Sequence, residues 1–307
     1  MQTKPKIAIL VPCHNEEQTI GKVLQDFRAV LPDAALVVFD NCCTDNTAAI
    51  ARKNGATVSK EPRKGKGFVV ESMLRKVDAD YYVMVDGDDT YPAEDVHTLL
   101  APLLAEEADM VVGARLSTYT DKSFRPLHVA GNNLIRWIIN FIFDADLTDV
   151  LSGYRAFNRR VCQCIPVVSS GFEIETELTI QMLYYNLAIK EVQIPYRERP
   201  DGSESKLSTF RDGWRVVWKI FSLFRAFRPL SFFGGLGALL FVAGLAAGIP
   251  PVHGFIESGY TEVTRFPLAI LATGLMILAF SSTFLGILLH SINYRVRELH
   301  NIITRQK

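Results

Sequence analysis

Charged residues are missing from two long stretches near the C-terminal end of the chain. Residues 229–256 and residues 266–294 contain no Asp, Glu, Lys or Arg. Each run is longer than the ~20 residues that a helix needs to cross a bilayer, and the glycines between residues 234 and 248 suit close helix packing in lipid. A pair of buried core helices is the alternative, which the length of both runs disfavours. The sequence therefore predicts two transmembrane helices.

Paired cysteines and an excess of one charge are absent as well. The chain of 307 residues has five cysteines, an odd number with no C-x-x-C pair, and 33 basic residues balance 33 acidic ones. These cysteines favour a reduced, cytosol-facing protein over a disulfide framework or a zinc site. The charge balance gives no indication of nucleic-acid binding. The length allows one large or two small domains.

Three familiar sequence signals are also missing. The first residues, "MQTKPKIAILVPCHNEE", reach charged side chains after a short apolar run, so no secretory signal is predicted. No G-x-G-x-x-G follows the first apolar stretch, and no G-x-x-x-x-G-K-[ST] occurs anywhere. The fingerprints of dinucleotide-binding and P-loop proteins are therefore absent.

What the first ~115 residues contain is an alternation of apolar strands and helical stretches. Strands that are apolar throughout suit a sheet buried on both faces. We expect them at residues 6–13, 34–40, 81–87 and 109–115, with a weaker one at 56–61. Helices are expected between them, at residues 16–31, 44–54, 65–78 and 93–106. This pattern predicts an α/β fold with a doubly wound, mostly parallel sheet.

Residues 116–200 are predicted to be of mixed α+β type. A helix is expected at 171–185 and a strand at 189–196. Glu173 and Glu177 would share one face of this helix, with Glu175 elsewhere, and a solvated face is the default for at least one of them. The sequence assigns these glutamates no role.

Polar residues follow three of the predicted strands. "MVDGDDTYP" places Asp86, Asp88 and Asp89 directly after an apolar run, Asp40 ends another strand, and "VPCHNEE" ends the first. In open α/β sheets, ligands bind beyond the carboxyl ends of the strands. Carboxylates this close repel one another unless a cation lies between them, and Mg²⁺ or Mn²⁺ bridging to a nucleotide diphosphate would supply it. "RKGKG" (63–67) offers Lys64 or Lys66 to a phosphate, or is a basic surface turn.

Taken in order, "VPCHNEE", "VVFDNCCTDNT", "GKG", "VDGDD", "VVGAR", "LTDVLSGYRAF" and "GSESKL" resemble a family 2 glycosyltransferase of GT-A fold. Within that family the chain is similar to polyprenyl-phosphate sugar synthases such as dolichyl-phosphate mannose synthase. The resemblance covers residues 5–215, and the two predicted membrane spans are similar to the anchor of bacterial members.

The resemblance implies site residues by motif. Asp86 and Asp88 would hold a metal, Mg²⁺ or Mn²⁺, with the diphosphate. The residues implied in binding the nucleotide sugar are Pro12, Asn15, Glu16, Asp40, Lys66 and Asp86. The residues implied in binding an acceptor phosphate are Arg115, Arg199 and Lys206. The residues expected to carry catalysis are Asp88, Asp149, Arg199 and Lys206.

The chemistry of the acceptor supports a lipid phosphate. A phosphate is already an anionic nucleophile, so it needs no strong base but does need cations beside it. From residue 206 to 228 there are six basic residues and one acidic residue, directly before the first apolar run. Attraction to anionic lipid headgroups explains Arg225 and Arg228 better than acceptor binding does.

Residues 210–228 are predicted to form an amphipathic helix in the membrane interface. Its aromatic residues recur at helical spacing, with Arg211, Arg215 and Lys219 beside them. They are Phe210, Trp214, Trp218, Phe221 and Phe224. An ordinary amphipathic helix packed on the domain is the alternative.

The expected organisation is a cytoplasmic domain (1–209), the interfacial helix (210–228), a transmembrane hairpin (229–294) and a cytoplasmic tail (295–307). Basic residues flank the hairpin on both chain ends, whereas residues 253–265 hold Glu257 and Glu262 against Arg265. The positive-inside rule then predicts a protein of the cell membrane with both ends in the cytoplasm.

Three functions are compatible with these features. The leading one is an inverting glycosyltransferase that moves a sugar from a nucleotide diphosphate sugar to polyprenyl phosphate. The second is a membrane glycosyltransferase acting on a sugar hydroxyl, which would need Asp149 or Asp89 as its base. The third is a non-catalytic nucleotide-sugar-binding subunit of the membrane. Whether the protein forms a homo-oligomer is left open.

Overall fold

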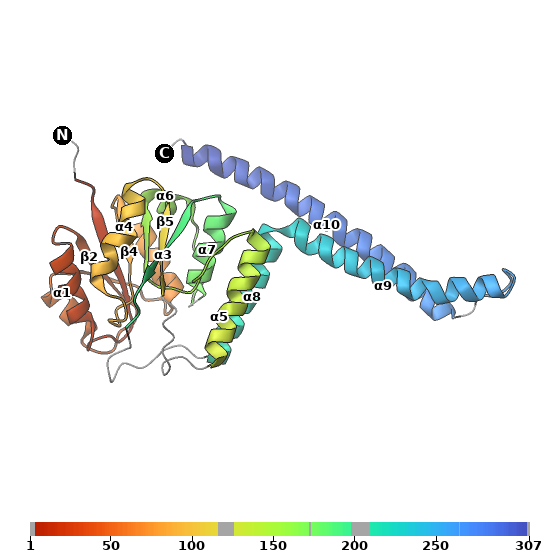
Figure 1. The fold of residues 1–307 in the computed structure, drawn as a ribbon, viewed down its shortest axis with the longest axis horizontal. Helices are drawn as coiled ribbons and strands as arrows, with labels where there is room; N and C mark the ends of the chain where they lie inside the picture. The colour runs from red at the N-terminus through yellow and green to blue at the C-terminus, as the bar shows by residue number, and fades with distance from the viewer. Residues whose placement is uncertain (1–3, 116–125, 172, 198–208, 264, 306–307) are drawn as a thin grey trace. The chain divides into compact units, whose positions relative to one another are not determined.

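The computed structural model describes residues 4–115, 126–171, 173–197, 209–263 and 265–305. It divides the chain into two compact units, Met1–Ile220 and Phe221–Lys307. The N-terminal unit is built around one sheet, and the C-terminal unit consists of helices (Figure 1).

Seven strands form the sheet of the N-terminal unit, in the order β3-β2-β1-β4-β6-β5-β7. The strands are β1 (Ile7–Cys13), β2 (Ala35–Asp40), β3 (Thr57–Lys60), β4 (Tyr81–Met84), β5 (Met110–Arg115), β6 (Arg155–Asn158) and β7 (Ile189–Ile194). β6 runs antiparallel to both of its neighbours, and the other pairings are parallel. The prediction of a mostly parallel α/β sheet is confirmed.

Helices cover both faces of this sheet (Figure 1). They are α1 (Ile20–Val30), α2 (Thr47–Lys53), α3 (Lys66–Lys76), the 3₁₀ turn η1 (Ala93–Asp95), α4 (Val96–Leu104), α6 (Arg159–Cys164) and α7 (Ile174–Tyr184), and a further helix, α5 (Pro126–Phe143), contacts α7. Successive residues of a strand point to opposite faces. Ile9 and Val11 accordingly pack with α1, α2 and α4, whereas Ala8 and Leu10 pack with α3, α6 and α7. This two-sided burial is why the strands are apolar throughout.

The sequence did not predict α5, β6 or α6. β6 lies between β4 and β5, so these two strands are not neighbours as their order along the chain would suggest. The short segment "RAFN" has no long apolar run, and its central residues are buried because they pair with strands on both sides. The helix expected from Thr44 begins at Thr47, because Asp45 accepts hydrogen bonds from Thr47 in the preceding turn.

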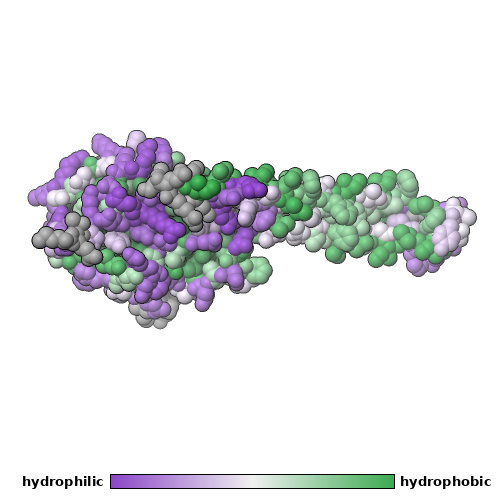
Figure 2. Space-filling model, turned by 90° about the horizontal axis from the view of Figure 1, so that it is seen from above, coloured by the Kyte–Doolittle hydropathy of each residue, from purple (hydrophilic) through white to green (hydrophobic). Residues whose placement is uncertain are grey.

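Two long apolar helices, α9 (Pro229–Glu257) and α10 (Phe266–Arg305), make up most of the C-terminal unit. Their apolar windows have a mean hydropathy of 2.1, and 11% of each window is buried inside the protein. Figure 2 shows mostly apolar residues over the surface of this pair, whereas polar residues predominate on the visible face of the N-terminal unit. By length and composition, both helices are able to span a membrane.

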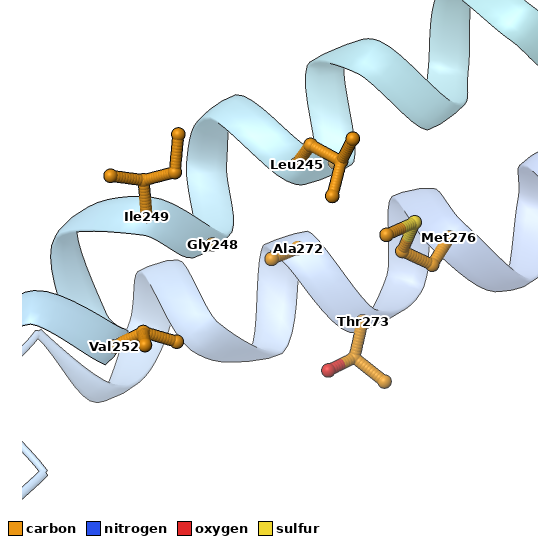
Figure 3. Close-up of a pocket in the computed structure, with 8 residues that line it drawn as sticks. Leu245, Gly248, Ile249, Val252, Ala272, Thr273 and Met276 are labelled. Atoms are coloured by element: carbon orange, nitrogen blue, oxygen red, sulfur yellow. The ribbon is translucent and has the colours of Figure 1, made fainter.

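Small residues bring α9 and α10 together as an antiparallel pair. A Cβ on Gly237 would collide with Thr283, and one on Gly244 would press against Met276. The Ser282 hydroxyl donates to the carbonyl of Phe233 at 2.8 Å. A shallow apolar hollow lies beside Gly248 and Ala272 (Figure 3). Close packing of small residues is how helices associate in lipid.

Helix α8 (Thr209–Phe227) presents two different apolar stripes. Val216, Ile220 and Leu223 are buried, whereas Trp214 and Trp218 are 67% and 61% exposed. The side chain of Phe210 lies outside the described part of the chain. The exposed tryptophans follow the aromatic stripe that the sequence assigns to the membrane interface, and the buried stripe explains why this helix also packs on protein.

Candidate active site

Three polar strand ends lie side by side at one edge of the sheet. β1 is paired in parallel with β2 on one side and with β4 on the other. Cys13 is the partner of Asp40 across β1 and β2, and the Val85 N–H donates to the carbonyl of Leu10 just past the end of β4. The loops that follow these strands therefore meet at one edge, as the sequence predicts.

The loops after β1 and β2 are tied to each other by residues that the sequence assigns to nucleotide binding. The Asp40 carboxylate accepts from the Cys43 N–H at 2.8 Å, and the side-chain Oδ1 of Asn15 accepts from the Thr44 N–H at 2.8 Å. Asn15 has a left-handed backbone (φ 57°), which asparagine tolerates. The Glu16 N–H donates to Thr47 Oγ1 at 2.8 Å. Pro12, the last residue of β1 but one, is half-buried at the same edge.

Lys66 is the cation that lies against the first carboxylate of the D-x-D segment. Its Nζ is 2.5 Å from Asp86 Oδ1 and 2.6 Å from Glu175 Oε1. Burial by itself would lower the pKa of Lys66, but Asp86 and Glu175 outweigh it and raise that pKa above its ordinary value. Lys66 is therefore charged at neutral pH. Its neighbour Lys64 is exposed, so of the two lysines the structure turns Lys66 toward the carboxylates.

Two glycines allow residues 65–67, here called the Lys66 loop, to lie against the backbone of residues 169–170. A Cβ on Gly67 would collide with the Ser169 carbonyl, and one on Gly65 would collide with the Ser170 carbonyl. Gly65 also has a φ of 141°, which other residues rarely adopt. Its N–H donates to Asn41 Oδ1 at 2.8 Å. The "GKG" motif thus places Lys66 by close backbone contact on both sides.

The three aspartates of "DGDD" have different surroundings. Asp86 is half-buried beside Lys66, and Asp88 is 4% exposed and accepts from the Thr90 hydroxyl at 2.6 Å. Asp89 instead lies 2.8 Å from Lys22 Nζ, on α1. Asp89 has a left-handed backbone (φ 58°), and its side chain pairs with α1 instead of with the partners of Asp86 and Asp88. The structure therefore separates Asp89 from the D-x-D pair.

Asp149 and Arg115 form a two-point ion pair. Arg115 Nε is 2.7 Å from Asp149 Oδ2, and Arg115 Nη2 is 2.9 Å from Asp149 Oδ1. Burial would raise the pKa of Asp149, but hydrogen bonds from Arg115 and its charge keep that pKa below the usual value. Asp149 is thus a weak base, held in place by the residue predicted to bind acceptor phosphate.

The loop that carries Asp149 is fixed by a buried arginine. Arg155 is fully buried and donates to the carbonyls of Val150 and Ser152 at 2.8 and 2.9 Å. Its Nη1 also donates to Thr179 Oγ1 at 2.9 Å, so β6 and α7 hold this loop together. Satisfying a buried guanidinium in this way is what makes its burial tolerable.

The same loop reaches the D-x-D pair at Gly153. A Cβ at this position would collide with the Asp86 carboxylate. The Gly153 N–H donates to the Tyr91 hydroxyl at 3.1 Å, and Tyr91 packs edge-on against Tyr196. Arg115 lies 5.5 Å from the centre of the Tyr196 ring. Contacts through Gly153, Tyr91 and Tyr196 therefore link Asp86 to the Arg115–Asp149 pair.

The two carboxylates of the D-x-D pair fit a hard divalent cation. Mg²⁺ is usually bound by one or two carboxylates, with water and substrate phosphate completing its shell. Asp86 and Asp88 supply two carboxylates at one strand end. Within the described ranges, no group of three His, Cys, Asp or Glu side chains has metal-site geometry. A two-carboxylate set suits an ion that shares its ligands with a bound diphosphate.

Sequence reasoning missed several residues that build the site. They are Asn41, Thr90, Tyr91, Gly153, Arg155, Glu175 and Tyr196. Glu175 was noticed without a role, and an acidic residue within an otherwise buried helix was the available signal. The expectation that at least one of the three glutamates has a solvated face is left to Glu173, which is partly exposed, because Glu175 and Glu177 are 4% and 0% exposed. Arg199 and Lys206 lie outside the described residues.

Comparison with known proteins identifies this arrangement. The mixed, mostly parallel sheet with a D-x-D turn at its edge belongs to the GT-A class of glycosyltransferases. The sequence model of glycosyl transferase family 2 matches residues 8–165, and the chain belongs to this family. It is therefore a glycosyltransferase, as the motifs predict.

Two similar proteins come from Haloferax volcanii. Glycosyltransferase AglJ is 34% identical over 250 residues, which are 81% of this chain and 82% of AglJ. A dolichyl-phosphate hexose transferase is 35% identical over 208 residues, 67% of this chain and 89% of that protein. Among solved structures, glucosyl-3-phosphoglycerate synthase from Mycobacterium tuberculosis with Mn²⁺, UDP-glucose and phosphoglyceric acid is similar in fold, with a TM-score of 0.61. The identity is 22%, covering 72% of this chain and 80% of that one.

Proposed function

We propose that the protein is an inverting glycosyltransferase that moves a sugar from a nucleotide diphosphate sugar to a polyprenyl phosphate at the cytoplasmic face of the membrane. The proposal rests mainly on the order of the segments along the chain. A family 2 domain with a D-x-D pair is followed along the chain by a helix with exposed tryptophans and by two apolar helices long enough to span a bilayer. An acceptor carried by the membrane suits that order. The relative named dolichyl-phosphate hexose transferase supports the same acceptor class.

Pro12, Asn15, Glu16 and Asp40 line the edge where the nucleoside of the donor would bind. Lys66 is placed to meet the diphosphate, because its charge already lies against Asp86. Asp86 and Asp88 would hold a Mg²⁺ or Mn²⁺ ion. When bound, that ion supplies positive charge to the departing diphosphate. The Mn²⁺ in the fold neighbour supports this choice of ion class.

The reaction needs no strong base. An oxygen of the acceptor phosphate forms the new bond to the anomeric carbon, and the bond to the nucleoside diphosphate breaks with its electron pair. Arg115, Arg199 and Lys206 would hold the acceptor phosphate. The pairing of Arg115 with Asp149 occupies two of the five N–H donors of its guanidinium, so the other three remain for the proposed acceptor phosphate.

A hydroxyl acceptor is the second candidate, and the geometry disfavours it. That reaction needs a carboxylate that removes a proton. Asp149 has a lowered pKa beside Arg115, and Asp89 is engaged by Lys22. Asp149 therefore lacks the raised pKa of a general base near neutral pH, and the Asp89 carboxylate is already paired with a lysine.

The proposed function is tested with the purified full-length protein. It is incubated with undecaprenyl phosphate, Mg²⁺ or Mn²⁺, and labelled UDP, GDP and dTDP sugars. We expect one labelled lipid product that depends on the phosphate of the acceptor, and no product with undecaprenol. Transfer to undecaprenol or to a soluble glycan at a similar rate would favour the hydroxyl acceptor instead.

We also propose that both chain ends are cytoplasmic and that residues 253–265 are extracytoplasmic. The structure offers an internal control, because the native Cys42 is exposed in the domain proposed to be cytoplasmic. Val263 is 50% exposed between α9 and α10. In intact cells, Val263→Cys in a Cys42→Ser background should react with an impermeant maleimide, whereas the native chain should react only after lysis. Labelling of native Cys42 in intact cells would contradict this topology and indicate the opposite orientation.

A further inference from the structure

The glutamate on α7 that the site does not use, Glu177, is fully buried and has four partners. Its Oε1 accepts from the Val168 N–H at 3.0 Å and from the Gln181 side-chain amide at 2.7 Å. Its Oε2 accepts from the Ser169 N–H at 2.6 Å and lies 3.3 Å from Lys219 Nζ. A buried carboxylate is costly unless it is paired and hydrogen-bonded. This one is both, and it holds the backbone of residues 168–169.

The backbone of residues 169–170 is in direct contact with the Lys66 loop. The carbonyls of Ser169 and Ser170 occupy the space beside Gly67 and Gly65, and the Gly67 N–H donates to the Ser170 carbonyl at 3.3 Å. A shift of residues 168–170 would therefore move the loop that presents Lys66 to Asp86. The contact is backbone against backbone, so no flexible side chain can absorb the shift.

Helix α7 reaches Lys66 by two routes. Glu175 contacts the Lys66 ammonium directly at 2.6 Å. Glu177 lies two residues further, about 200° around the helix, and acts through residues 168–170. The two glutamates therefore fix both the charge of Lys66 and the backbone that carries it.

Lys219 connects this arrangement to α8. The sequence places Lys219 beside the aromatic residues of the predicted interfacial helix, but its side chain is only 18% exposed and is paired with Glu177. Trp214 and Trp218 on the same helix are exposed. A buried carboxylate that loses its cation strongly destabilises the fold. The packing of α8 and the position of residues 168–170 therefore depend on each other.

We propose that Lys219 and Glu177 are positioning residues through which the amphipathic helix α8 holds the Lys66 loop in place for the donor diphosphate. This inference rests on the proposed function for its substrate, but the packing it describes does not. The donor site is thereby coupled to the helix that presents tryptophans to the membrane.

The test compares Lys219→Met and Lys219→Arg with Arg225→Met, a matched control at an exposed basic position of α8. Lys219→Met should raise the KM for the nucleotide sugar by about 2- to 30-fold and leave the KM for undecaprenyl phosphate within about twofold. Lys219→Arg should restore most of the donor KM, and Arg225→Met should change neither constant.

A second measurement does not require transfer. In Lys219→Met, the amides of Val168, Ser169 and Gly67 should exchange hydrogen about tenfold faster or more, and in Arg225→Met they should not. Glu177→Gln removes the buried charge instead of leaving it unpaired, and it should accelerate the same amides. If the native protein transfers no sugar, the proposed function fails while the exchange test still stands. Unchanged exchange in Lys219→Met, or equal changes in Arg225→Met, would overturn the coupling.

Discussion

Replacing Asp88 by asparagine should lower sugar transfer by about 10²–10³-fold or more without unfolding the protein. Asp88 is proposed to hold the divalent ion that offsets the charge of the departing diphosphate. The asparagine side chain keeps the shape of aspartate, and its carbonyl oxygen still accepts the hydrogen bond that Thr90 donates. The turnover number with the best donor and the melting temperature in detergent would be measured together.

Asp89→Asn is the matched control for this prediction. It removes a carboxylate one residue away, but Asp89 is paired with Lys22 outside the D-x-D pair. Its left-handed backbone is one that asparagine accepts. We expect Asp89→Asn to retain most of its activity. Full turnover by Asp88→Asn, or by the native protein in excess chelator, would rule out the metal role of Asp88.

The second large effect is expected at the buried ion pair of Arg115 and Asp149. Arg115→Met should destabilise the N-terminal unit by about 3–5 kcal/mol, because it leaves a buried carboxylate without its cation. Asp149 is 5% exposed, so water does little to replace the lost partner. Unfolding by urea, followed by circular dichroism, measures the loss.

The double variant Arg115→Met, Asp149→Leu separates stability from catalysis. Replacing both charges by apolar groups of similar size is often neutral for stability, so most of the lost stability should return. Transfer should not return, because the proposed acceptor site still lacks Arg115. Recovery of activity together with stability would show that Arg115 acts only as a structural residue.

The pair also predicts a direction of pH dependence. The pKa of Asp149 is lowered in the folded protein, so its contribution to stability is present above the unfolded value of ~3.9 and is lost as the pH falls through the folded pKa. Arg115→Met removes the cause of the lowered pKa. Its stability should therefore fall less steeply in acid than that of the native protein.

Local sequence patterns predict the main strands and the aspartates at their ends. Apolar stretches buried on both faces identify strands β1, β2, β4 and β5, because such strands have little polar surface in any context. The ends of those strands carry Asp40, Asp86 and Asp88, and parallel strands deliver their carboxyl ends to one edge. The two uncharged runs likewise determine α9 and α10, since a charge-free run longer than ~20 residues is itself the physical requirement for spanning a bilayer.

Only the tertiary structure decided which charges meet. The sequence places Lys66, Glu175 and Asp86 far apart along the chain, and close backbone contact at Gly65 and Gly67 brings them together. β6 is short and owes its burial to the strands on either side, so its own four residues carry no strong signal.

The same holds for Asp149 and Lys219. A motif predicts an acid near the reacting centre, but its pairing with Arg115 makes it a poor base. The spacing of Lys219 marks it as part of an amphipathic helix, but only the folded chain shows that it pairs with Glu177. Composition and spacing identify the strands that are apolar throughout and the two helices long and apolar enough to span a membrane, because those patterns depend on local burial. The partner of each buried charge depends on distance in the folded chain, which the order of residues alone does not contain.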